Sequence, residues 1–343
     1  MELTKDKILK VQKERGRGNK NIHVFARSAN HEWVIPAIDG REDYQIVLDW
    51  VAEGNEILEP PPKDIDPNRG PLAYRDYREC SVPEDDNNSV WRYMDFTKFV
   101  ALLENSALFF SRGSVITNED AFEGSFPENS KSPVFEMLSA EYKKNPNKFN
   151  LNFLLGMIPG KEWFRDMFKN EVLINCWCRD EHENHLMWAG YGKGESSIAV
   201  KSDLGLLKKS FGDYSDYDIY IGKISYIDYS LEEVEINPMD RIVPYLYKRV
   251  NFKSENEIRC FLVDDGDINL FPEDEPRPFE VGNGLMLNPG INVPVDLNLL
   301  IREIRVAPKA PIWLPDLIKS LLKRYNLSEK PVLLSDLAAK PKS

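Results

Sequence analysis

The irregular order of short strand-like and helix-like segments constrains this chain more than any other feature of its sequence. Apolar residues recur at helical spacing over 96–105, which predicts a helix. Short apolar runs over 108–111, 172–178 and 257–263 predict strands. Because these segments do not repeat as regular strand–helix–strand units, they favour an α+β fold. Residues 245–252 and 315–325 predict further helices.

Composition divides the chain into three parts. Residues 1–58 form an N-terminal extension of unknown role, in which 22–27 predict a strand and 44–51 predict a helix. Residues 59–88 are rich in Pro and Asp and have few apolar side chains to bury, so they predict a linker or an extended wrap. The compact domain is expected over 89–335.

The charge and hydropathy of the chain limit the kinds of molecule that it is expected to bind. The 343 residues carry 44 Lys and Arg against 56 Asp and Glu, a formal net charge of −12, and an acidic surface repels the phosphates of long nucleic acids. No run of 18 apolar residues occurs, which argues against a membrane partner. The polar N-terminus lacks an apolar signal segment. Four cysteines are few for a chain of this length, and we therefore expect a cytoplasmic protein.

Five short motifs place polar residues at the ends of predicted strands or in the turns between them. They are Trp91-Arg92-Tyr93, Leu108-Phe109-Phe110-Ser111, Asp120-Ala121-Phe122-Glu123, Met187-Trp188-Ala189-Gly190-Tyr191 and Glu255-Asn256-Glu257-Ile258-Arg259. No Gly-x-Gly-x-x-Gly or Walker sequence occurs, so a Rossmann or P-loop nucleotide site is unsupported.

Together the motifs resemble a bacterial family described as a domain of unknown function. Its pattern runs aromatic-Arg-Tyr, Phe-Ser, Asp-x-Phe-Glu, Met-Trp-x-x-Tyr and Glu-x-Glu-x-Arg, and Ala121 departs from it where the family usually has proline. The order of the polar residues in turn resembles the Arg-Ser-Glu group of the ADP-ribosyltransferase superfamily. That resemblance implies a mixed, mostly antiparallel split sheet with flanking helices over 89–335.

The same resemblance implies NAD as the cofactor and a role for each polar residue. Glu257 is expected to be the catalytic carboxylate, with Glu255 as a helper on the acceptor side. Arg92 and Ser111 are expected to hold the dinucleotide, with Tyr93 as a ring partner. All are expected to meet in one cleft. In these terms the chain resembles a toxin or a phage-defence effector that transfers ADP-ribose to an unidentified protein, nucleic acid or small molecule.

The chemistry of this reaction suits these residue types. Breaking the nicotinamide–ribose bond builds positive charge on the sugar, and a fixed carboxylate stabilises that charge more in the transition state than in the substrate. A second carboxylate can orient or deprotonate the acceptor. A planar guanidinium can form paired hydrogen bonds to a pyrophosphate.

Two other functions stay open at the level of sequence. The first is a non-enzymatic interaction module, an antitoxin or a sensor, on the same fold. The second is a metal-dependent nuclease that uses a carboxylate cluster, Asp120, Glu123, Glu255 and Glu257. Cys176 and Cys178 are too closely spaced for a typical zinc site and predict buried core thiols on one face of a strand, so we assign no metal ligands.

Overall fold

The computed structural model divides into two compact units, Met1–Gly70 and Pro71–Ser343. Before residue 73, the structure describes residues 10–13, 23–27, 32–36, 42–53 and 57–58. From 73 to 339 it describes every residue except 78–79, 83–84, 118–119, 128, 147–167, 193, 213–216, 236, 238–239 and 265–288.

The described residues of the N-terminal unit form a small four-stranded sheet and one helix. Its elements are β1 (Lys10–Lys13), β2 (His23–Arg27), β3 (Glu32–Pro36), α1 (Glu42–Ala52) and β4 (Ile57–Leu58), with strand order β3-β2-β1-β4. The strand and the helix predicted in this part are confirmed as β2 and α1. In α1, Val47 and Trp50 are buried, whereas Gln45 and Asp49 are joined by an exposed hydrogen bond, as expected of an amphipathic helix.

The division between the units lies inside the range predicted as a linker, 59–88. The described residues that follow it belong to the second unit. Ala73 is fully buried there, and its N–H donates to the carbonyl of Gly212 at 2.7 Å. Cys80 is also buried.

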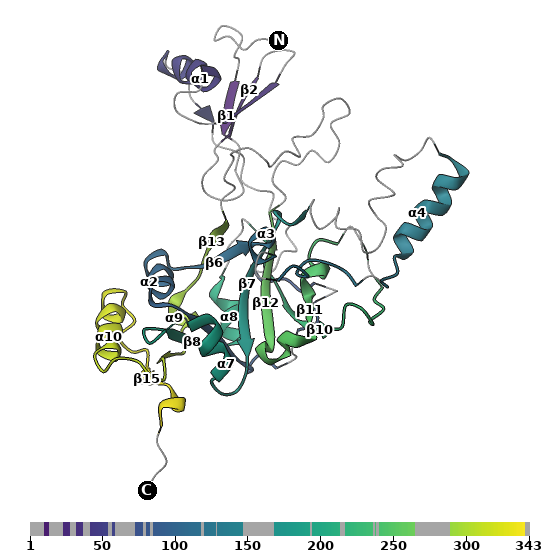
Figure 1. Ribbon diagram of the computed structural model, residues 1–343. Coiled ribbons are helices and arrows are strands. Elements are labelled where there is room, and N and C mark those ends of the chain that lie inside the picture. Colours follow the sequence, from purple (N-terminus) through teal and green to yellow (C-terminus); the bar gives the residue numbers. More distant parts are fainter. Residues whose placement is uncertain are drawn as a thin grey trace. The chain divides into compact units, whose positions relative to one another are not determined.

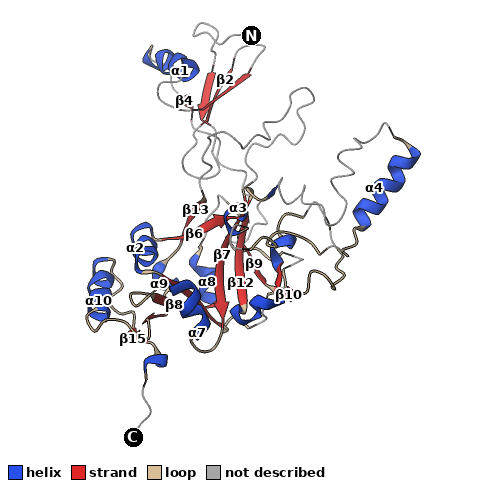
Figure 2. Cartoon of the chain, viewed as in Figure 1, coloured by secondary structure: helices blue, strands red, loops and turns tan. Residues whose placement is uncertain are grey.

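A nine-stranded sheet forms the centre of the second unit, with strand order β13-β6-β7-β5-β8-β14-β15 and with β12 and β9 on the other side of β7. Of its pairings, β14–β15 is parallel and the others are antiparallel. The predicted α+β class with a mixed, mostly antiparallel sheet is therefore confirmed (Figures 1 and 2). The strands are β5 (Ser89–Met94), β6 (Ala107–Arg112), β7 (Val172–Arg179), β8 (Ile198–Asp203), β9 (Tyr220–Lys223), β12 (Glu257–Val263), β13 (Gly290–Pro294), β14 (Glu303–Val306) and β15 (Val332–Leu334).

Helices accompany the sheet, and two of them were predicted from periodicity. The predicted helices at 96–105 and 315–325 are confirmed as α2 and α10. The helices are α2 (Phe96–Asn105), α3 (Gly113–Ile116), α4 (Pro133–Lys144), α7 (His185–Met187), η2 (Trp188–Gly192), α8 (Leu204–Ser210), α9 (Leu297–Leu300), α10 (Leu314–Arg324) and η5 (Asp336–Ala338). Within the described ranges, no helix is long and apolar enough to cross a bilayer.

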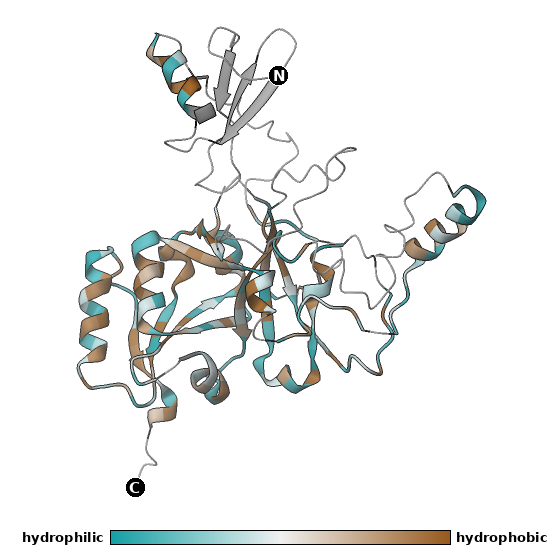
Figure 3. Cartoon of the chain, turned by 45° about the horizontal axis from the view of Figure 1, so that its top comes forward, coloured by the Kyte–Doolittle hydropathy of each residue, from teal (hydrophilic) through white to brown (hydrophobic). Residues whose placement is uncertain are grey.

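The sheet has two faces of different character. Side chains alternate along each strand, so Val90, Trp177 and Ile258 share one face. These residues pack in one apolar cluster with residues of α2, α8, α9 and α10, and we call this side the helix-covered face. In Figure 3, hydrophobic and hydrophilic residues alternate along α10, whose buried residues include Ile318. The amphipathic pattern of α10 arises because one side of the helix packs against the helix-covered face of the sheet.

The opposite side of the sheet carries charges, and we call it the charged face. Glu257 is paired in register with Cys178, and Arg259 with Cys176, so all four side chains project to this side. β7 and β12 run side by side through the body over their whole length (Figure 1).

The sheet is split along the other edge of β7. β6 pairs with β7 at Leu173 and Ile174, whereas β5 pairs with it at Cys178 and Arg179. Between these points, side chains take the place of a backbone ladder. Asn175 donates its amide to the carbonyl of Phe109 at 2.8 Å and accepts the indole N–H of Trp177 at 2.8 Å.

The helix predicted over 245–252 is wrong. Tyr247–Arg249 is a strand, β11, which pairs in parallel with β10 (Ser225–Ile227). Two short 3₁₀ helices flank it, η3 (Val243–Leu246) and η4 (Val250–Glu255). The extended backbone lets Lys248 reach two carboxylates near the start of β12, a long-range contact that local periodicity cannot reveal.

The bridge that Asn175 forms across the split can be tested by substitution. Asn175→Ala leaves the buried indole N–H of Trp177 and the carbonyl of Phe109 without their partner, at a cost of about 1–3 kcal/mol for each group. We expect a matching fall in the free energy of unfolding in urea. The exposed Asn298→Ala is the control and should change this free energy by less than about 0.5 kcal/mol. Equal losses in the two variants would contradict the bridging role of Asn175.

Candidate active site

Glu257 is the first residue of β12 and its carboxylate is nearly enclosed by cations. The residue is 5% exposed. Its Oε1 accepts Nε of Arg259 at 2.9 Å, and its Oε2 accepts Nη2 of Arg259 at 2.9 Å and Nζ of Lys248 at 3.2 Å. Burial by itself raises the pKa of Glu257, but the two cations outweigh it and lower that pKa to about 2. The carboxylate is therefore ionised at any physiological pH.

Arg259 joins Glu257 to a second carboxylate from a distant segment. Its Nη1 and Nη2 donate to the two oxygens of Glu123 at 2.8 and 2.7 Å, and Nη1 also donates to the carbonyl of Tyr245 at 2.9 Å. The arginine is 1% exposed. A planar guanidinium can hold two carboxylates in fixed orientations, which a lysine cannot do.

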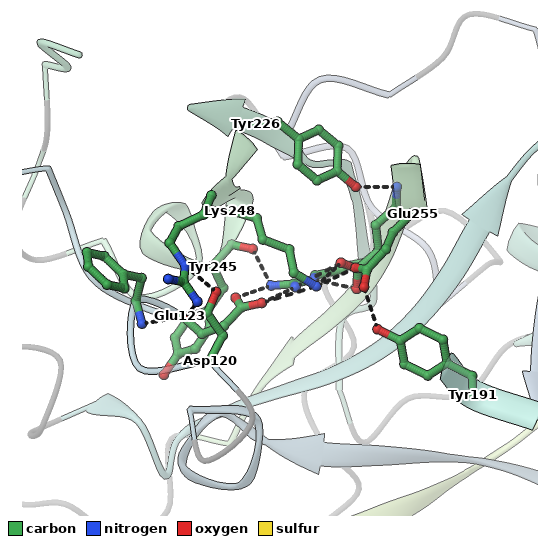
Figure 4. Close-up of polar contacts among 11 residues, drawn as sticks. Asp120, Glu123, Tyr191, Tyr226, Tyr245, Lys248 and Glu255 are labelled. Atoms are coloured by element: carbon green, nitrogen blue, oxygen red, sulfur yellow. Dashed lines mark hydrogen bonds and ion pairs between the residues drawn. The ribbon is translucent and has the colours of Figure 1, made fainter. Parts of the chain in front are cut away.

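Lys248 is the second cation of this network. Its Nζ lies 2.5 Å from Oε2 of Glu255, 3.2 Å from Oε2 of Glu257 and 3.6 Å from Oε1 of Glu123. Burial lowers the pKa of Lys248, but the three carboxylates raise it above its ordinary value, so the ammonium stays charged. Figure 4 shows Lys248 extending toward the glutamates.

Three carboxylates and two cations leave this network with one excess negative charge, and it reaches solvent on one side. The side chain of Glu255 is 14% exposed, and its Oε1 accepts the hydroxyl of Tyr191 at 2.9 Å. Tyr191 is 39% exposed. Because burial raises the pKa of Tyr191, the phenol stays protonated and donates a hydrogen bond to Glu255 (Figure 4). We call Glu255 and Tyr191 the solvent edge of the network.

A separate ion pair lies beside the network. Asp120 is buried and binds Arg249, with Oδ1 at 2.8 Å from Nη2 and Oδ2 at 3.2 Å from Nε. The guanidinium also lies over the ring of Phe122, 4.8 Å from its centroid. This pairing orders the Asp-x-Phe-Glu turn that carries Glu123.

The expectation that Arg92 meets Glu257 in one cleft is wrong. Trp91 is paired with Cys178 and shares its face with Glu257, so the next residue, Arg92, projects toward the helix-covered face. Its Nη1 donates to the carbonyl of Cys176 at 2.8 Å, at the split in the sheet. Burial lowers the pKa of Arg92, and no described carboxylate forms an ion pair with it.

Ser111 and Tyr93 lie on the charged face but differ in surroundings. Ser111 is paired with Ile174, and Glu257 is paired with Cys178. Because these two partners are four residues apart on β7, Ser111 and Glu257 are separated by about 13 Å along the strand direction. Tyr93 is buried; its hydroxyl accepts the N–H of Asn184 at 2.8 Å and its ring packs edge-on against Trp188. The structure thus brings Glu255 and Glu257 together and leaves Ser111 at a distance.

The four carboxylates weighed as a metal-binding cluster are all paired with basic side chains. Asp120 binds Arg249, Glu123 binds Arg259, and Lys248 binds the remaining two, Glu255 and Glu257. These contacts occupy oxygens that a divalent cation would need. Across the described ranges, no group of three or more His, Cys, Asp or Glu is arranged to hold a metal ion.

Sequence reasoning missed the two cations that hold this site together. Arg259 is part of the Glu-x-Glu-x-Arg motif, whereas Lys248 lies outside the five motifs, in the Lys-Arg pair that ends β11. The sequence could have indicated them because the buried carboxylates of the acidic motifs need basic partners elsewhere in the chain. Which acid meets which base depends on the packing of β11 and β12.

Comparisons with known proteins do not extend this picture. No protein-family model, no curated protein and no solved structure matched the chain.

The network predicts a specific response to acid. Because the folded pKa of Glu257 lies near 2, below the ordinary 4.5, its contribution to stability is fully present above pH 4.5 and is lost as the pH falls toward 2. Glu257→Gln should lower the free energy of unfolding by about 3–5 kcal/mol at neutral pH, because Arg259 and Lys248 lose a partner. Between pH 4.5 and 2 the variant should lose less additional stability than the wild type.

Denaturant unfolding over this pH range measures both effects. The matched control is Glu329→Gln, whose side chain is 60% exposed and whose ion pair with Lys330 spans 3.7 Å. Identical pH profiles for the wild type and Glu257→Gln would refute the assigned role of the carboxylate.

Proposed function

We propose that this chain is a cytoplasmic NAD-dependent ADP-ribosyltransferase that acts on an unidentified acceptor. The observation that carries the proposal is the placement of Glu257 and Glu255 at the start of β12, one locked in ionised form and the other at the solvent edge. The split sheet supports an ADP-ribosyltransferase-like fold for this unit.

The charge of the network suits a reaction that develops a sugar cation. Glu257 cannot take up a proton near neutral pH, and its position is fixed by Arg259 and Lys248. The excess negative charge therefore stands in place before the reaction begins, and no reorganisation is needed when the nicotinamide–ribose bond breaks.

The solvent edge supplies the acceptor side of the proposed reaction. Glu255 has an ionised partner in Lys248 and a neutral donor in Tyr191, and its exposure lets an acceptor hydroxyl or amine approach. As the second carboxylate, Glu255 orients that group or removes its proton. Because the chain has a net charge of −12, we expect a protein or a small molecule, rather than a long nucleic acid, as the acceptor.

In this proposal the cofactor-binding residues contribute to different extents. Arg92 projects toward the helix-covered face, so in this proposal it stabilises the split between β5 and β6 through Cys176 and does not contact a dinucleotide bound beside Glu257. Ser111 lies further along the charged face, where the rest of a dinucleotide would extend. Tyr93 acts through packing against Trp188. A toxin or a defence effector is the biological setting that this chemistry suits.

One observation favours a second candidate, a non-enzymatic interaction module on the same fold. Both oxygens of Glu257 already accept hydrogen bonds from Arg259 or Lys248, and the residue is 5% exposed. A carboxylate whose oxygens are engaged in this way is suited to a structural role. The two candidates differ in whether NAD is consumed.

The enzyme is tested by release of nicotinamide from NAD, followed by chromatography with protein, nucleic-acid and small-molecule acceptors. We expect turnover by the wild type and a fall of about 100-fold or more in Glu255→Gln, which keeps the shape of the side chain but removes its charge. Glu255→Gln should retain the wild-type melting temperature within a few degrees, because Lys248 keeps Glu257 as a partner.

Glu329→Gln serves as the control of equal charge change and should keep full turnover. If the wild type releases no nicotinamide with any acceptor, the enzymatic proposal fails and the interaction module is favoured.

A further inference from the structure

A cavity of about 640 Å³ opens beside the start of β12, and its lining is basic. Arg179, Lys223 and Lys253 contribute three positive charges, and none of its lining residues is acidic. The remaining polar lining includes the hydroxyl-bearing Ser81 and Ser225. In a chain with a net charge of −12, such a concentration of positive charge in one hollow is unusual.

The three cations are not used to hold the fold through ion pairs. In the part of the chain that the structure describes, no carboxylate lies within ion-pair distance of Arg179, Lys223 or Lys253. Arg179 is fixed in another way, since its backbone N–H donates to the carbonyl of Asn256 at 2.9 Å and its Nη2 donates to Oδ1 of the same residue at 3.3 Å. Its guanidinium is thus oriented without being neutralised.

The cavity differs from the solvent edge in position as well as in charge. Lys223 is paired with Ile258, and Arg179 follows Cys178, so both side chains project away from the charged face that bears Glu257. Tyr226 links the two regions. Its hydroxyl accepts the N–H of Glu257 at 2.8 Å (Figure 4). The phenol stays protonated, because burial raises the pKa of Tyr226, and the residue also lines the cavity.

We infer that this cavity binds a phosphate-bearing small molecule through Arg179, Lys223 and Lys253. Its lining combines cations with hydroxyl donors, which are the groups that coordinate phosphate oxygens in proteins. Its volume falls in the range of sites for small ligands and is large enough for a diphosphate or a mononucleotide. This inference goes beyond the proposed transferase activity and does not depend on it.

Calorimetric titration of the full chain with inorganic pyrophosphate tests the site. We expect saturable binding that weakens as the salt concentration rises. Lys223→Gln and Lys253→Gln should each weaken it about tenfold or more, because each removes one charge-assisted contact. Lys223 lies at the end of β9, and Lys253 lies in η4. If both variants lose pyrophosphate affinity, local misfolding of one element cannot explain both losses.

The matched control is Lys323→Gln on the exposed side of α10, which removes the same charge and should leave the affinity unchanged. Titration with ADP in place of pyrophosphate should show the same dependence on Lys223 and Lys253. An absence of pyrophosphate binding by the wild type, or an equal loss in Lys323→Gln, would overturn the inference.

The same titration separates this site from the proposed active site. Glu255→Gln should bind pyrophosphate with unchanged affinity, because Glu255 does not line the cavity. Loss of pyrophosphate binding in Glu255→Gln would contradict an independent site, whereas an inactive wild type that still binds pyrophosphate would contradict only the transferase proposal.

Discussion

The pairing of Arg259 with Glu257 and Glu123 is the interaction on which this part of the structure depends. Three carboxylates gather on one face of the sheet, and each would be costly to bury without a counter-charge. Arg259 and Lys248 offset most of that cost, and they lower the pKa of Glu257, so that this carboxylate remains ionised in a largely buried place. The Asp-x-Phe-Glu turn, β11 and the start of β12 are thereby fastened together although they are far apart in sequence.

The three carboxylates of this cluster differ in how accessible they are to solvent. Glu257 and Glu123 are saturated by their cations, whereas Glu255 lies at the boundary with solvent and bonds Tyr191. In the proposed reaction, the fixed and enclosed Glu257 stabilises charge, and the accessible Glu255 contacts the acceptor. The split between β5 and β6 adds an arginine without a described counter-ion, and the basic cavity lies on the opposite side of β12.

Much of the second unit could be predicted from local patterns. The helical spacing over 96–105 and the apolar runs over 172–178 and 257–263 correspond to α2, β7 and β12, because burial of one side of each element dictates the spacing. The segment 245–252 could not be predicted in this way. Its apolar spacing fits a helix, but Lys248 is drawn to carboxylates of β12, and a short strand satisfies that contact.

For the site, the amino-acid sequence specifies which chemical groups are present: two glutamates two residues apart, an Asp-x-Phe-Glu turn, and the basic residues Lys248 and Arg259. Which of these groups meet depends on the packing of the folded chain. Strand register turned Arg92 away from Glu257, since a shift of one residue exchanges the faces of a sheet. The packing of the Asp-x-Phe-Glu turn against β12 brought Glu123 to Arg259. Register is fixed by packing between strands distant in the chain, and no local pattern encodes it.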